Sequence, residues 1–312
     1  MSASPAPAGP FDGALRLSDW GLIRAQGADA RSFLHAQLTQ DVQHLPVGRA
    51  TPAGYCSAKG RLLASFVLWP VSDDEVWLAC SADLLADTVK RLSMFVLRAK
   101  CRLSDLSTEV ELWGSVGPAA AGAPAEPWQV QRDGDLHAVR LPDAWVDGQR
   151  VARALHVLPA GRPLRAAALE PALWQALEAR AGVPRIVAAT RELFVPQMVN
   201  LELVGGVSFQ KGCYPGQEVV ARSQYRGTLK RRGFALHGTA PMAPAQEVFH
   251  SADPGQPAGQ VVLAGQLAPG RVHALVELKI AATEGGTLHL GAPDGPPLQL
   301  DDLPYALPTE AA

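Results

Sequence analysis

Residues 209–218 read Phe-Gln-Lys-Gly-Cys-Tyr-Pro-Gly-Gln-Glu, and they place one thiol in a segment built for a tight bend. Gly212 and Gly216 permit positive φ or a close approach of the backbone, and Pro215 stiffens the turn between them. A cysteine that fills a core usually has aliphatic neighbours, whereas Cys213 has a cation, an aromatic ring, an amide and a carboxylate nearby. We interpret Cys213 as a thiol that another molecule reaches. The alternative is a tight turn in which the cysteine merely fits.

The chemistry of this thiol depends on what stabilises its thiolate, which is the nucleophilic and metal-binding form. Lys211 favours the thiolate if its ammonium lies close. A helix that begins at Gln217 would add exposed N–H groups near the sulfur. Val219 and Val220 suit a strand equally well, so the helix and the strand both remain open.

A basic series follows the loop, and no acidic residue interrupts it between positions 219 and 233. On a helix, residues 222, 226 and 230 share one face. Such a face can bind a polyanion, either RNA phosphates or the glutamate tail of a cofactor, and the alternative is a solvated edge. The series consists of Arg222, Arg226, Lys230, Arg231 and Arg232.

Asn200 and Glu202 precede the loop in the segment Asn-Leu-Glu-Leu. A carboxylate between two leucines is typical of the polar face of a strand. Near a cleft, the same carboxylate of Glu202 can bind a heterocycle with adjacent N–H donors, as a pterin has.

Composition places the chain among ordinary globular proteins. It has 312 residues, 47% of them hydrophobic and 19% charged, with a formal net charge of -2. These values predict two or three domains and argue against a protein built throughout to bind nucleic acid. No apolar run has the length of a membrane span, and we expect a cytoplasmic protein without membrane contact. Residues 1–12 read as a disordered arm and not as a signal peptide.

The four cysteines are scattered and show neither a Cys-x-x-Cys pair nor zinc-ligand spacing. This pattern indicates free thiols in a reducing compartment and predicts no metal site. They are Cys56, Cys80, Cys101 and Cys213.

Periodicity predicts strands and helices in alternation over residues 13–232, which is typical of an α+β domain. The nearly continuous apolar run 62–69 predicts a strand buried on both faces. Asp29 is placed to cap the first helix. The other expected strands are 15–25, 75–80, 100–106 and 110–116, with weak signals over 128–160. The expected helices are 30–38, 83–96 and 171–181, and 117–127 is an expected surface loop or linker.

From residue 233 the pattern changes to five short strands separated by Gly/Pro turns. The strand 272–280 alternates apolar and polar residues and is predicted to be buried on one side only. Five such strands in about eighty residues predict a small β-barrel. The sequence therefore divides into an arm (1–12), an α+β body (13–232) and a barrel domain (233–312).

Several of these motifs resemble the YgfZ-type folate-binding proteins. The resemblance rests on Lys211-Gly212-Cys213-Tyr214 followed by Gly216-Gln217-Glu218, and it extends to Ala221-Arg222, Gly227 and Lys230-Arg231. The segments 27–42, 56–61 and 196–202 also resemble the family, so the resemblance spans most of residues 15–290.

This resemblance implies a fold like that of the glycine cleavage T-protein: a body with a ferredoxin-like portion, a central folate cleft and a C-terminal barrel. It implies a tetrahydrofolate-binding accessory protein that assembles or maintains iron–sulfur clusters in client enzymes. These clients include radical enzymes that thiomethylate tRNA, so tRNA is only an indirect partner. Cys213 is then the functional thiol. The implied folate contacts are Asn200, Glu202, Lys211, Tyr214, Gly216, Gln217, Arg222 and Arg226.

A tetrahydrofolate-dependent aminomethyltransferase is the alternative function, and one stretch weakens it. Where the T-protein has a strand with a catalytic aspartate, this chain reads Leu62-Leu63-Ala64-Ser65-Phe66, without a carboxylate. Whether the protein turns over a substrate by itself stays open.

Overall fold

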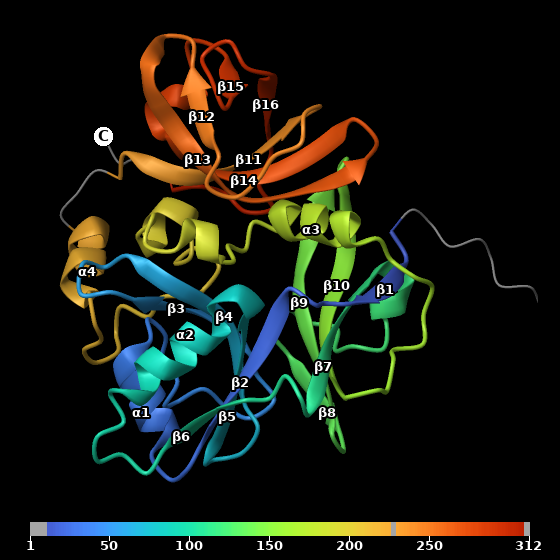
Figure 1. Ribbon diagram of the computed structural model, residues 1–312, viewed down its shortest axis with the longest axis vertical. Coiled ribbons are helices and arrows are strands. Elements are labelled where there is room, and N and C mark those ends of the chain that lie inside the picture. Colours follow the sequence, from blue (N-terminus) through green and yellow to red (C-terminus); the bar gives the residue numbers. More distant parts are fainter. Residues whose placement is uncertain (1–10, 226–228, 309–312) are drawn as a thin grey trace, which may run out of the picture.

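The computed structural model describes residues 11–225 and 229–308, which form two antiparallel sheets and a closed barrel (Figure 1). None of the helices in these two ranges is both long and apolar enough to cross a membrane. The predicted arm falls largely on residues 1–10, which lie outside the described ranges.

The first sheet has the order β3-β4-β5-β2-β6. Its strands are β2 (Trp20–Gln26), β3 (Thr51–Cys56), β4 (Leu62–Pro70), β5 (Glu75–Ser81) and β6 (Arg102–Asp105). Every residue of β4 is buried, which confirms the prediction for this apolar run. Because side chains alternate along a strand, Phe66 and Leu68 enter one core while Val67 and Trp69 enter another.

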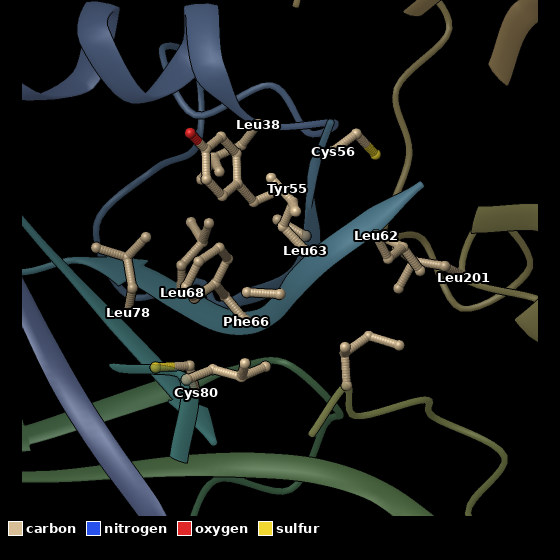
Figure 2. Close-up of a cluster of buried hydrophobic side chains, with 14 of the residues drawn as sticks. Leu38, Tyr55, Cys56, Leu62, Leu63, Phe66, Leu68, Leu78, Cys80 and Leu201 are labelled. Carbon is tan, nitrogen blue, oxygen red and sulfur yellow. The ribbon is translucent and has the colours of Figure 1, made fainter. Parts of the chain in front are cut away.

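Two helices belong to the first of these cores, α1 (Ala30–Gln37) and α2 (Ala82–Ser93). Asp29 occupies the N-cap position of α1 but does not cap it, because its carboxylate accepts a hydrogen bond from the backbone N–H of Lys100 (2.7 Å). Helix α2 ends earlier than predicted. Figure 2 shows the core between α1 and the sheet, where Leu201 comes from a distant segment and approaches Leu62.

The second sheet has the order β1-β7-β10-β9-β8. It packs against the face of the first sheet that lies opposite α1 and α2. Its strands are β1 (Gly13–Arg16), β7 (Val110–Val116), β8 (Val130–Asp133), β9 (Leu136–Val146) and β10 (Gln149–Pro159). The weak signals over 128–160 thus belong to β8 and to the long hairpin β9–β10. The expected linker 117–127 begins with a short 3-10 helix, η1 (Gly117–Ala120).

The chain crosses to the barrel through α3 (Pro171–Arg180), η2 (Ala188–Thr190), η3 (Pro196–Val199) and α4 (Gln217–Tyr225). Helix α3 lies between the second sheet and the barrel (Figure 1). Strand β13 passes close over the backbone of α3, since a Cβ on Gly265 would collide with Ala176.

The predicted barrel is confirmed as six strands closed in the order β11-β14-β13-β12-β15-β16. They are β11 (Arg231–Gly238), β12 (Glu247–His250), β13 (Asp253–Ala268), β14 (Arg271–Lys279), β15 (Leu288–Leu290) and β16 (Pro297–Asp301), with η4 (Ile280–Thr283) after β14. The one-sided burial predicted for β14 is wrong. His273 and Glu277 are both buried, because Asp301 and Arg231 provide them with partners.

Candidate functional site

Lys211 holds the cysteine loop against the first helix. Its ammonium donates hydrogen bonds to the backbone carbonyls of His35 and Leu38 (2.9 Å to Leu38), where α1 ends with free carbonyl groups. It also lies 4.7 Å from the centre of the Tyr214 ring. Burial lowers the pKa of Lys211 to about 8. The lysine therefore anchors the loop, and its hydrogen bonds go to helix carbonyls.

Gly216 lets the loop pack against a second motif of the sequence. Its φ is +79°, and a Cβ there would lie 2.7 Å from the backbone nitrogen and Cα of Gly60. Gly60 has φ +70° in turn, and its own Cβ would lie 2.8 Å from the Cβ of Val219. Only two glycines allow this approach of the 57–60 turn to the loop. The motifs 56–61 and 209–218 therefore form one structural unit.

Cys213 is the exposed thiol of the chain. Cys56 and Cys80 are buried, and burial raises the pKa of each to about 12. Cys101 is partly buried, and burial raises its pKa to about 11. Cys213 alone stands on a loop fixed from both sides and open to solvent. The interpretation of an accessible sulfur is thus consistent with the geometry.

Gln217 begins α4, so the segment is helical and the strand alternative is excluded. Its N–H bonds the carbonyl of Tyr214 (3.2 Å), and Val220 buries its side chain below the helix. Arg222 is exposed on α4, whereas Arg226 lies outside the described residues.

The rest of the basic series does not form one face. Arg231 and Arg232 lie on β11, where each pairs with a carboxylate: Arg231 with Glu277 (3.0 Å) and Arg232 with Glu202. Of the series that the structure describes, Arg222 and Lys230 are the exposed members. The pairing of the two barrel arginines reduces the polyanion-binding potential that the sequence indicated.

Asn200 and Glu202 form a buried joint between η3 and the barrel. Asn200 adopts φ +59° and donates to the carbonyl of Gly233 (2.8 Å). Burial raises the pKa of Glu202, although Arg232 opposes this shift, and its Oε2 has no hydrogen-bond partner among the described residues. The expected pterin contact of Glu202 stays a prediction. In this structure the carboxylate of Glu202 forms an ion pair with Arg232.

A cavity of about 640 Å³ opens where the second sheet, the end of α3 and the C-terminal segment meet. Trp128, Trp145 and Tyr305 give it aromatic walls, and the exposed Arg150 adds a cation. Tyr305 crosses to the body by donating to the carbonyl of Gly182 (2.7 Å). The volume is typical of a site for a drug-sized ligand. None of the described residues predicted from the cysteine motif lines this cavity, although Leu203 and Val204 follow Glu202 directly and do line it.

A smaller cavity of about 30 Å³ shares Trp128 and Pro142 with the large one and has room for one or two waters. Arg153 lines it while only 3% exposed, and its Nε and Nη1 have no hydrogen-bond partner among the described residues. Burial lowers the pKa of Arg153 to about 10. Glu178 also lines it and accepts two hydrogen bonds from Arg185 (3.1 and 2.9 Å).

Sequence reasoning missed Arg153, Glu178 and the aromatic wall. Glu178 lies one residue after Leu177 on an apolar helix, and a carboxylate at a buried helical position was the only available signal. The large cavity combines segments separated by more than a hundred residues, so no local sequence pattern predicts it. Among the described residues, no group of histidine, cysteine and acidic side chains is arranged to hold a metal ion.

The fold is that of the T-protein. The crystal structure of the glycine cleavage system aminomethyltransferase T from Bartonella henselae matches with a TM-score of 0.71, covering 95% of this chain and 87% of that one at 18% identity. This likeness confirms the predicted α+β T-protein-like fold with a C-terminal barrel.

Sequence comparison leads to a more specific relationship. The tRNA-modifying protein YgfZ of Edwardsiella ictaluri is 33% identical, covering 94% of this chain and 92% of the relative. The tRNA-modifying protein YgfZ of Vibrio vulnificus is 32% identical with the same coverage. No protein-family model matches the chain. At this identity over nearly the whole length of both proteins, the chain belongs to the YgfZ family.

Proposed function

We propose that the protein is a folate-binding accessory factor that assembles or maintains iron–sulfur clusters in client enzymes, and that Cys213 is the group that meets the client. One observation carries the proposal. Of the four thiols, Cys213 is exposed on a loop that Lys211 and Gly216 hold in place, while the others are buried or half-buried. The names of the relatives as tRNA-modifying proteins support clients that act on tRNA. The iron–sulfur cluster is cargo of the client in this proposal.

The size and the aromatic walls of the large cavity support the folate part of the proposal, although Asp143 and Asp302 also line it. Tetrahydrofolate has a bicyclic pterin, an aromatic linker and an anionic glutamate tail. Trp128, Trp145 and Tyr305 offer ring surfaces to the first two, and the guanidinium of Arg150 is suited to carboxylates of the tail.

The smaller cavity, which has room for one or two waters, adds polar groups next to the aromatic wall. Water there can accept from the unpartnered N–H donors of Arg153 and donate to the free lone pairs of Glu178. In this proposal such water bridges these two side chains to a pterin in the large cavity. In this proposal Glu202 supports the lining segment at Leu203, and Glu178 is the carboxylate nearer to the ligand.

The folate proposal is tested by titrating tetrahydrofolate with one and with several glutamates into the purified protein. We expect Trp128→Ala to weaken both ligands at least tenfold, because it removes the wall shared by the two cavities. Arg150→Gln should weaken the polyglutamate form more than the monoglutamate form, since Arg150 is exposed and faces the tail in this proposal, and the longer tail carries more carboxylates. Glu247→Gln, on the exposed side of the barrel, is the matched control. Equal binding by all variants would place folate elsewhere or nowhere.

The role of the thiol is tested by complementation of a strain that lacks its own homologue, with tRNA thiomethylation as the readout. We expect Cys213→Ser to fail while folate binding and the circular dichroism spectrum stay unchanged. Cys101→Ser removes a half-buried thiol and should complement fully. Full complementation by the Cys213 variant would end the thiol proposal.

An aminomethyltransferase is the second candidate, because the fold is that of the T-protein. Strand β4 lines the smaller cavity at Ser65, whose hydroxyl accepts a hydrogen bond from the N–H of Ile186 (2.8 Å). No carboxylate occurs anywhere in β4. The purified protein should therefore show no transfer of a one-carbon unit to tetrahydrofolate, and measurable turnover would favour this candidate instead.

A further inference from the structure

His35 lies beside the loop that contains Cys213. The backbone carbonyl of His35 accepts a hydrogen bond from Lys211, and its ring lies against the next residue of the loop. A Cβ built on Gly212 would be 3.9 Å from Nε2 of His35, which is van der Waals distance. Gly212 directly precedes Cys213, so the imidazole lies against the residue next to the cysteine in the chain.

Asp41 fixes the orientation of this imidazole. Nδ1 of His35 lies 3.0 Å from Oδ1 of Asp41. The carboxylate is held in place by the backbone N–H (3.1 Å) and the ring (2.9 Å) of His44. In the neutral imidazole, Nδ1–H donates to the carboxylate and Nε2 keeps its lone pair. Among the described residues, none hydrogen-bonds to Nε2 of His35.

The charges around His35 favour its neutral form. Burial and the nearby Lys211 ammonium lower the pKa of His35, and they outweigh the opposing effect of Asp41. His44 acts in the same direction as Lys211. The titratable groups that act on the ring are therefore Lys211, Asp41 and His44. At neutral pH the ring is a proton acceptor, and the Lys211 ammonium favours an anion next to it.

We propose that His35, oriented by Asp41, is the proton acceptor for Cys213. The inference rests on the proposed function, in which Cys213 is the reacting thiol. The proton of Sγ passes to Nε2 of His35, which leaves a thiolate beside an imidazolium whose Nδ1–H stays on Asp41. The thiolate then attacks an electrophile. With iodoacetamide as the probe, an S–C bond forms, the C–I bond breaks, iodide leaves and the imidazolium returns its proton to water.

The test is the rate at which iodoacetamide alkylates the folded full-length protein between pH 5 and 9, with mass spectrometry to locate the product. Cys101→Ser is the background, so that Cys213 is the accessible thiol. We expect His35→Gln to lower the rate at pH 7 at least about tenfold, because the proton acceptor is lost. Asp41→Asn should lower the rate as well, because the ring loses its orientation.

His289→Gln is the control, since His289 lies on β15 of the barrel and hydrogen-bonds to the carbonyl of Gly295 there. Its profile should follow that of the parent. The proposal is overturned if the His35→Gln profile coincides with that of the parent, or if His289→Gln lowers the rate as much. Because the probe needs neither folate nor client, this result is independent of the complementation assay. Failure of His35 and failure of the proposed function are therefore distinguishable.

Discussion

Gly216→Ala tests the contact on which the position of Cys213 depends. The φ of +79° alone costs an alanine about 1 kcal/mol. In addition, the new methyl group would lie 2.7 Å from the backbone of Gly60, whereas carbon atoms prefer about 3.5–4.0 Å. The atoms that the methyl group would meet belong to the backbone, so either the cysteine loop or the 57–60 turn must move. Overpacking of this kind costs about 1–3 kcal/mol. We expect a total loss of about 2–4 kcal/mol from the free energy of unfolding.

Gly205→Ala is the control for the backbone conformation. Gly205 has φ +83°, and no heavy atom lies within 4 Å of where its Cβ would be. This variant should lose only the conformational cost of about 1 kcal/mol. Urea unfolding followed by circular dichroism compares the two. If Gly216→Ala unfolds at the same urea concentration as Gly205→Ala, the loop does not pack on the 57–60 turn and the reasoning fails.

Three further predictions concern buried polar contacts around the site. Glu202→Gln leaves Arg232 without its charge partner and should cost about 3 kcal/mol, while Glu202→Leu combined with Arg232→Met should recover most of it in urea unfolding. Burial raises the pKa of Asp301, but its hydrogen bond with His273 and the nearby cations outweigh burial, so the pKa is lowered. The carboxylate therefore stabilises the fold at pH values above its unfolded-state pKa, and this stabilisation is lost as the pH falls. Asp301→Asn should flatten the dependence of the free energy of unfolding on pH between about pH 5 and 2. Thr39→Val removes the buried bond from Oγ1 to the carbonyl of Gly206 (2.6 Å) and should cost about 2 kcal/mol, with faster amide exchange in 206–216; unchanged exchange there would contradict it.

Local patterns were sufficient where one short segment determines its own environment. The apolar run of β4 predicted burial on both faces, since its alternate side chains enter two separate cores. The pattern of the segment 217–225 was equivocal, because Val219 and Val220 suit a helix and a strand. Tertiary contacts decided it: Val220 is buried below the helix, and Val219 lies at the site where a Cβ on Gly60 would fall.

The candidate site was only partly predictable for the same reason. The turn-forming residues around Cys213 indicated an accessible thiol without any knowledge of its surroundings. The hydrogen-bond partners of Lys211 are carbonyl groups at the end of α1, more than 170 residues earlier, so no local pattern predicts them. Glu178 has the sequence context of an ordinary helical residue. Its importance depends on a cavity that exists only after the two sheets, α3 and the segment 183–185 have assembled.

The residues that line the large cavity differ from those around Cys213, yet one short segment connects the two sites. Leu203 and Val204 line the large cavity, and Gly206 follows two residues later. The backbone N–H of Ser208 donates to the carbonyl of Thr39 (2.9 Å), directly after Leu38, whose own carbonyl accepts from Lys211. The end of α1 therefore holds both the segment that leaves the cavity and the loop that carries Cys213. Because each of these bonds involves a buried group, the loop cannot shift relative to the cavity wall without breaking at least one of them.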